Sequence, residues 1–340
     1  MHSHEERHHT FVDALKSMER LFRQAEEQPP AARPLPLLHG LCQAARAIAS
    51  CAPGLADDGW RLTSNGIRST APLPGDLADI ALVTEPSGSA GGFARVSEIL
   101  GSPVWGDTPL RLEDAWDALP VNLDHPLTDR RRRTPLYVHG DVGDAEPRAI
   151  LTVSVCDIPD HVMRAGTREA LDEHLEFFPP AASCHGYGCH VRGGTLVPAL
   201  SPFPHGRGGI RMDWVMPQGE TGRSARLDRL RSMTTEYAGN RYFMPVIPSL
   251  RAELHPLMAW WAVLCGLGSL IHDRPDDWRA HLGAEGTVRA AESVSHLLRE
   301  APRDLAHVIA EALEQAAATT SSHDRDRSSR PKAGPHHPAM

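Results

Sequence analysis

Residues 256–271 read PLMAWWAVLCGLGSLI and form the most membrane-like stretch of the chain, bracketed by His255 and His272. The stretch holds 16 residues, whereas a helix that spans a membrane needs ~20 apolar residues. It therefore predicts a helix buried in the core of a folded protein. We do not expect the protein to associate with a membrane.

Helical periodicity extends to both sides of this stretch. Apolar residues at helical spacing predict helices over residues 11–25 and 37–50, and over 275–282, 285–300 and 302–317. Residues 10–125 are thus predicted to form a helical N-terminal part and residues 250–317 a helical C-terminal part. We expect these two parts to pack together, because their apolar helix faces need partners.

The middle of the chain, residues 130–248, contains several short segments with the sequence pattern of β-strands. Leu151, Val153 and Val155 alternate with Thr152 and Ser154, as in a half-buried strand. Residues 167–178 predict one inserted helix. The order of helical, β-rich and helical segments predicts an α+β fold with a mainly antiparallel sheet.

The two ends of the chain differ from the rest. Residues 1–9 are rich in His, and residues 318–340 carry almost no large apolar side chains. Such segments cannot bury enough apolar surface to offset their ordering entropy. Both ends are therefore predicted to be disordered.

Composition excludes several classes of protein. The chain has 340 residues with 41% hydrophobic and 23% charged residues, values typical of a folded protein rather than a disordered chain or a fibre. Only Lys16 and Lys332 are Lys among 35 basic residues, a bias expected of GC-rich coding. So few Lys exclude a phosphate-binding loop of the G-x-x-x-x-G-K-[ST] type. A net charge of −8 argues against a general nucleic-acid binder.

Cysteine usage indicates the compartment. The six Cys are scattered along the chain, and the polar start MHSHEERHHT lacks the apolar core of a secretion signal. A reducing, cytoplasmic location is predicted, with most Cys acting as small hydrophobes.

One cluster offers metal ligands. Two glycines are surrounded by four possible ligands, Cys184, His185, Cys189 and His190. Two Cys and two His form one of the known ligand sets of structural zinc sites. Adjacent residues on an extended chain point in opposite directions, so other ligands would have to come from Cys156, His161 or His205. The alternative is a His-rich turn without metal, and no other cofactor is expected.

Catalytic candidates lie in the last third. Arg289 and His296 have the Arg and His spacing of HEPN-type ribonucleases, and His272 and Arg274 precede them. A hydrolase acting on nucleic acid or nucleotides could use these four residues. With 20 His and a large excess of Arg, such pairs also arise by chance, so the alternative is a solvated helix face.

A run of four Arg, Arg130, Arg131, Arg132 and Arg133, lies in the link before the β-rich part. The guanidinium group of Arg can donate two hydrogen bonds to one phosphate. The run is therefore a candidate phosphate-binding loop and the one place where nucleic acid could bind. The alternative is an exposed, mutually repelling charge run.

Three stretches, taken together, resemble one family. They are Phe22–Ala25 with Pro36–Leu41 and Ala44–Ala47; Asn65–Ile67 with Gly92-Phe93; and Leu254–Met258 with Ser269–Ile271 and Pro275–Trp278. In this order they resemble the YaaC-like proteins over about residues 20–315. The chain has His272-Asp273-Arg274-Pro275 where the family pattern has Arg-Tyr-His-Pro, and His39 where the family has tyrosine. The resemblance implies one intact α+β protein and supplies no mechanism.

These observations favour a cytoplasmic regulatory or interaction protein without catalysis of its own. Its partner would be an unidentified protein, and a homo-oligomer stays open. The alternative is the hydrolase described above.

Overall fold

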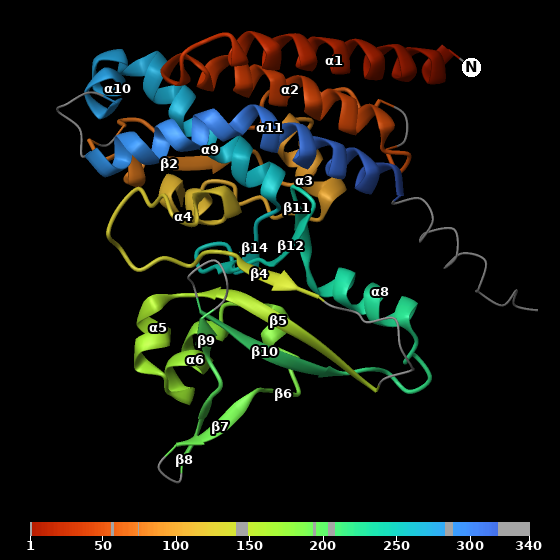
Figure 1. Ribbon diagram of the computed structural model, residues 1–340. Helices are drawn as coiled ribbons and strands as arrows, with labels where there is room; N and C mark the ends of the chain where they lie inside the picture. Colours follow the sequence, from red (N-terminus) through yellow and green to blue (C-terminus); the bar gives the residue numbers. More distant parts are fainter. Residues whose placement is uncertain are drawn as a thin grey trace, which may run out of the picture.

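The computed structural model describes residues 2–55, 58–73, 75–140, 149–192, 195–202, 208–282 and 288–318. Figure 1 shows a body of helices built from the two ends of the chain and, below it, an antiparallel sheet built from the middle. The predicted α+β class with helical flanks is confirmed. The predicted disordered tail lies outside the described residues, except for Ala318.

The apolar stretch forms α9 (Pro256–Asp273), which runs through the centre of the helical body. All of its residues from Pro256 to Gly268 are buried. The prediction of a buried core helix is confirmed. Among the described helices, none is both long and apolar enough to cross a membrane.

The other elements of the helical body surround α9. Its core draws on both ends of the chain, so the expected packing of the two helical parts is confirmed. The elements are α1 (His2–Glu26), η1 (Pro30–Ala32), α2 (Pro34–Cys51), β1 (Ile67–Ser69), η2 (Leu77–Asp79), β2 (Ala81–Thr84), α3 (Gly92–Leu100), β3 (Leu110–Arg111), α4 (Leu112–Asp117), η3 (Pro120–Asn122), α10 (Pro275–Leu282) and α11 (Val288–Ala318).

The prediction of a disordered start is wrong for residues 2–9, because α1 begins at His2. The guanidinium of Arg7 donates to the carbonyl oxygens of Ser50, Ala52 and Leu55 at 3.2, 2.6 and 3.0 Å. These carbonyls lie at and beyond the end of α2, where helix acceptors lack partners within the helix. This contact between distant segments holds the polar first turns of α1 in place.

The two helices predicted over 285–300 and 302–317 are one helix, α11, with Pro302 inside it. Proline has no N–H, so it leaves the carbonyl four residues earlier without its helical donor. Here that carbonyl belongs to Leu298, and Arg33 donates to it at 3.0 Å. Apolar residues on both sides of Pro302 enter the same core, which favours a continuous helix.

The middle part is a sheet with strand order β11–β12–β4–β5–β10–β6, and β9 also pairs with β10. All of these pairings are antiparallel. Leu151, Val153 and Val155 of β5 are buried and Thr152 is exposed, so the predicted alternation is confirmed. The strands are β4 (Leu136–His139), β5 (Ile150–Ile158), β6 (Gly186–Tyr187), β9 (Ser201–Pro202), β10 (Gly208–Val215), β11 (Thr235–Tyr237) and β12 (Asn240–Phe243).

Short helices pack against the buried face of this sheet and share its core. The prediction of one inserted helix is corrected, because four occur among the described residues: α5 (Asp160–Ala165), α6 (Arg168–Leu175), α7 (Pro179–Ala182) and α8 (Arg223–Met233). Two ribbons complete the fold: β7 (Cys189–Arg192) with β8 (Thr195–Pro198), and β13 (Val246–Ile247) with β14 (Ala252–Glu253).

The sheet and the helical body are joined by a buried polar contact as well as by the chain. The hydroxyl of Tyr237, on β11, donates to the Asp304 carboxylate of α11 at 2.8 Å. The indole N–H of Trp260 donates to the same hydroxyl at 3.2 Å. The strands at this end of the sheet are therefore fixed against α9 and α11, and a seam runs between the two parts beside them (Figure 1).

Candidate functional site

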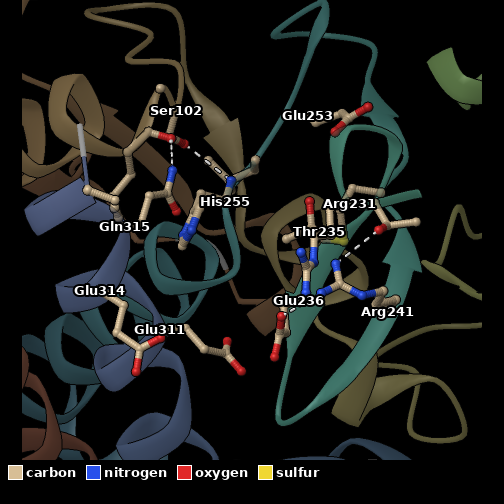
Figure 2. Close-up of a pocket in the computed structure, with 16 residues that line it drawn as sticks. Ser102, Arg231, Thr235, Glu236, Arg241, Glu253, His255, Glu311, Glu314 and Gln315 are labelled. Carbon is tan, nitrogen blue, oxygen red and sulfur yellow. Dashed lines mark hydrogen bonds and ion pairs between the residues drawn. The ribbon is translucent and has the colours of Figure 1, made fainter. Parts of the chain in front are cut away.

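A cavity of about 780 Å³ lies in this seam, and we call it the seam cleft. The helical body contributes the end of α3, His255 at the start of α9 and the last turns of α11. The sheet side contributes the end of α8, β11 and β12, and β14 closes one side (Figure 2). Its volume falls within the range of small-molecule sites.

His255 has a structural role in the wall of the cleft. Its Nδ1 accepts the N–H of Leu257 at 3.2 Å and so caps the N-terminus of α9. The backbone N–H of His255 donates to the hydroxyl of Ser102 at 3.2 Å. Burial lowers the pKa of His255 to about 4, against a smaller opposing effect of Gln315. The imidazole is therefore neutral near pH 7.

Both cationic residues of the cleft already have acidic partners. Arg241 pairs with Glu236 at 2.9 Å and also donates to the hydroxyl of Thr234 at 3.3 Å. Arg231 pairs with Asp228 at 3.3 Å. Their charge is thus largely compensated within the protein.

The remaining carboxylates of the cleft have no such compensation. Among the described residues, the side-chain carboxylates of Glu253 and Glu314 have no hydrogen bond or ion pair, and the carboxylate of Glu311 accepts only a 3.4 Å bond from the N–H of Gly239. Burial raises the pKa of Glu253 to about 7. Burial also raises the pKa of Glu311, against the favourable bond from Gly239. The cleft therefore carries unpaired acidic groups, one of which exchanges protons near neutral pH.

The predicted catalytic residues lie elsewhere. His272 and Arg274 are exposed at the end of α9. Arg274 donates to the carbonyl of Leu73 at 2.9 Å and pairs with Asp277 at 2.5 Å. Neither residue is among those that line the seam cleft.

Arg289 and His296 lie two turns apart on α11, and both contact the segment 121–129. Arg289 forms an ion pair with Asp129. His296 bonds to the carbonyl of Val121 at 3.3 Å and stacks on His125 at 3.6 Å between ring centroids. The spacing that suggested a ribonuclease pair thus positions two residues on the face that holds this segment. They do not line the cleft either.

The four predicted zinc ligands are not brought together. The thiol of Cys184 lies against the carbonyls of Gly186 and Asp213, whereas His185, Cys189 and His190 are exposed. In the described ranges, no group of three or more His, Cys, Asp or Glu is arranged to hold a metal. His205 lies outside these ranges. All six Cys are free thiols.

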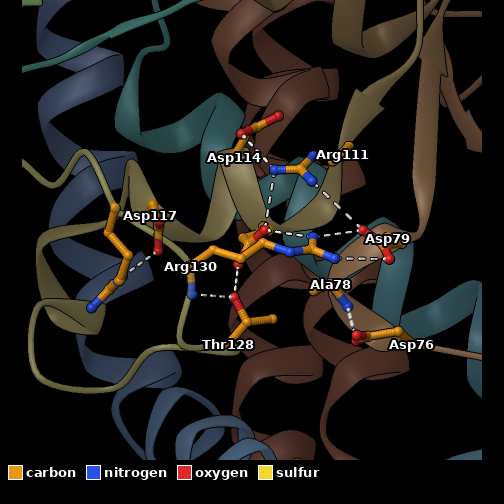
Figure 3. A network of polar contacts seen from close by, with 10 residues as sticks. Asp76, Ala78, Asp79, Arg111, Asp114, Asp117, Thr128 and Arg130 are labelled. Carbon is orange, nitrogen blue, oxygen red and sulfur yellow. Dashed lines mark hydrogen bonds and ion pairs between the residues drawn. The ribbon is translucent and has the colours of Figure 1, made fainter.

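The Arg run is extended, and its side chains alternate between the two parts of the molecule. Arg130 pairs with Asp79 at 2.7 Å and with Glu113 at 3.0 Å, both in the helical body (Figure 3). Arg132 pairs with Asp117 at 2.7 Å. In the other direction, Arg131 pairs with Glu173 of α6 at 2.9 Å, and Arg133 lies over the ring of Phe177 at 3.9 Å.

These contacts leave little free positive charge for a phosphate. Arg132 also donates to the carbonyls of Leu123 and Asn122 at 2.9 and 2.8 Å. A second cavity, of about 540 Å³, is lined by Arg130, Arg131 and Arg132, but Asp124 and Asp160 line it too. Phosphate bound there would have to compete with carboxylates that the guanidinium groups already contact.

Sequence reasoning missed the seam cleft. Its unpaired acidic residues come from β14 and the end of α11, more than 50 positions apart in the sequence. A single Glu that belongs to no motif does not indicate a binding site from the sequence alone. Only His255 was conspicuous, as one boundary of the apolar stretch.

The stretches that resemble a known family form the core of the helical body. The Asn65 side chain accepts the indole N–H of Trp261 at 2.8 Å. Gly66 has a φ of 77°, where a side chain would be strained and its Cβ would lie 3.0 Å from the backbone N of Phe93. Trp278 donates to the carbonyl of Ala31 at 3.1 Å. These residues specify packing between distant segments.

No curated protein and no solved structure matches the chain. The family model described as YaaC-like Protein matches residues 2–313, a span that covers both the helical body and the sheet. The chain therefore belongs to the YaaC-like protein family.

Proposed function

We propose that this protein is a cytoplasmic regulatory protein that acts by binding a small ligand in the seam cleft, without catalysis of its own. The observation that carries the proposal is the position of the cleft, whose walls come from the helical body and from the sheet. A ligand held there contacts both parts. It therefore stabilises one arrangement of the seam over others, which is how a ligand changes the surface offered to a partner.

Two further observations support this proposal. The six free thiols fit a reducing compartment. The residues considered for hydrolysis bind structural partners instead: Arg274 contacts Leu73, and His296 contacts Val121.

A thermal-shift screen of the full chain against a library of small metabolites tests the proposal. We expect at least one compound to raise the midpoint of unfolding, because a ligand that binds only the folded state stabilises it. A Thr235→Trp variant, which places bulk in the cleft, should lose the shift. Thr152→Trp, which adds the same bulk on the exposed side of β5, should keep it.

Turnover decides between binding and catalysis. The stabilising compound is incubated with the protein and followed by NMR. We expect it to be recovered unchanged. A compound that is converted by the wild type and not by Thr235→Trp would overturn the proposal, as would a screen in which no compound binds.

A further inference from the structure

The charges around the seam cleft are unevenly compensated. Arg231 and Arg241 have carboxylate partners at 3.3 and 2.9 Å, and the second of these partners, Glu236, also lines the cleft. Glu253, Glu311 and Glu314 have no cationic partner within ion-pairing distance among the described residues. A ligand that enters the cleft therefore meets uncompensated negative charge and little free positive charge.

The positions of these three carboxylates add a geometric constraint. Glu311 and Glu314 lie three residues apart on α11, so their side chains are neighbours and repel each other. Figure 2 shows Glu253 on the other side of the cleft, on the strand β14. One compact cation can neutralise only one side. A chain with a positive group at each end can reach both.

We propose that the ligand of the seam cleft is a small aliphatic diamine or polyamine, with one ammonium group on Glu253 and another on the Glu311 and Glu314 pair. This inference rests on the proposed function and names the ligand class of that same site. Ammonium groups form charge-assisted hydrogen bonds with carboxylates. The methylene chain between them would span the cleft.

Alternative ligand classes fit less well. Hard divalent cations bind to convergent oxygen ligands, and no group of three or more acidic or other metal-ligating residues converges in the described ranges. Anionic ligands would have to displace Glu236 from Arg241. A diamine removes the repulsion without disturbing either existing ion pair.

Binding of such a cation must be coupled to proton release. The pKa of Glu253 is raised to about 7 by burial, so about half of these carboxyls are protonated at pH 7. A bound ammonium favours the charged carboxylate and lowers this pKa. Affinity should therefore rise by up to about tenfold between pH 6 and pH 8, as the deprotonated fraction grows.

Calorimetric titration of the full chain with putrescine and spermidine tests the inference at physiological salt. Putrescine serves for the pH series, because its two amines stay charged across this range. We expect binding by the wild type, release of about half a proton at pH 7 in buffers of different ionisation enthalpy, and no binding of butanediol of the same chain length. Glu253→Gln should weaken binding and abolish the pH dependence.

A matched pair of variants separates the cleft from general attraction to an acidic protein. Glu314→Gln and Glu292→Gln remove the same charge from the same helix, but only Glu314 lines the cleft. The first should weaken binding and the second should not. Equal affinities in wild type, Glu253→Gln and Glu314→Gln would overturn the inference.

The two proposals fail separately. A neutral or anionic compound whose thermal shift is lost in Thr235→Trp would refute the amine and leave the regulatory cleft standing. If no compound of any charge binds in the cleft, both proposals fall.

Discussion

The Arg run and the seam cleft are two charged regions of opposite character. In the run, Arg130, Arg131 and Arg132 each pair with a carboxylate, and Arg133 lies over an aromatic ring. In the cleft, three carboxylates lack a cationic partner among the described residues. The conspicuous charges of the sequence therefore hold the two parts of the molecule together. The inconspicuous ones are those left available to a ligand.

Among the substitutions that test this contrast, Arg132→Ala should change the free energy of unfolding most. Arg132 and Asp117 are only 16% and 11% exposed at their side chains, so the substitution leaves a buried carboxylate and two carbonyls without their donor. Removing one partner of a buried pair costs about 3 kcal/mol, and we expect a loss of that size in urea unfolding. Arg131→Ala is the neighbouring control, because its pair with Glu173 is 56% and 61% exposed and is worth at most about 0.5 kcal/mol. Equal losses in both variants would show that the run does not distinguish buried from exposed pairs.

An effect of opposite sign is expected in the cleft, from Glu253→Gln. The pKa of Glu253 is about 7 in the folded protein against an ordinary 4.5, so the folded state binds the proton more tightly than the unfolded chain. The carboxyl therefore costs no stability below pH 4.5, costs more as the pH rises to 7, and reaches its full cost above that. With allowance for solvent screening, Glu253→Gln should raise the free energy of unfolding by about 1 kcal/mol at pH 8.

The same variant should leave stability unchanged at a pH well below 4.5, where the carboxyl is protonated in both states. Glu292→Gln, on the exposed side of α11, is the control and should have no effect at either pH. A stabilisation that is equal at both values would contradict the raised pKa.

The smallest effect is expected for the residues that first suggested catalysis. The ion pair of Arg289 with Asp129 is 54% and 85% exposed, so Arg289→Ala should lower stability by no more than about 0.5 kcal/mol. Incubation of wild type and Arg289→Ala with a mixture of RNAs should give no cleavage by either protein. Cleavage that requires Arg289 would reinstate the hydrolase and reverse the comparison between the two regions.

Local sequence patterns correctly predicted the helix that is apolar on all sides and the strand in which apolar and polar residues alternate. The apolar stretch 256–271 is too short to span a membrane and is therefore expected in the core, and the alternation in 151–155 described β5 correctly. The same reasoning failed at Pro302 and at residues 2–9. In both places the deciding contact joins distant segments: Arg33 donates to the carbonyl of Leu298, and Arg7 of α1 donates to carbonyls at and beyond the end of α2.

The sequence by itself determined the class of this protein, its family and its buried central helix. Burial of apolar side chains depends on patterns a few residues long, and those patterns are visible in one chain. Only the tertiary structure decided which charges are compensated. An ion pair depends on a distance of a few ångströms between residues such as Arg132 and Asp117, or on its absence around Glu253, and a linear order of residues does not contain that distance.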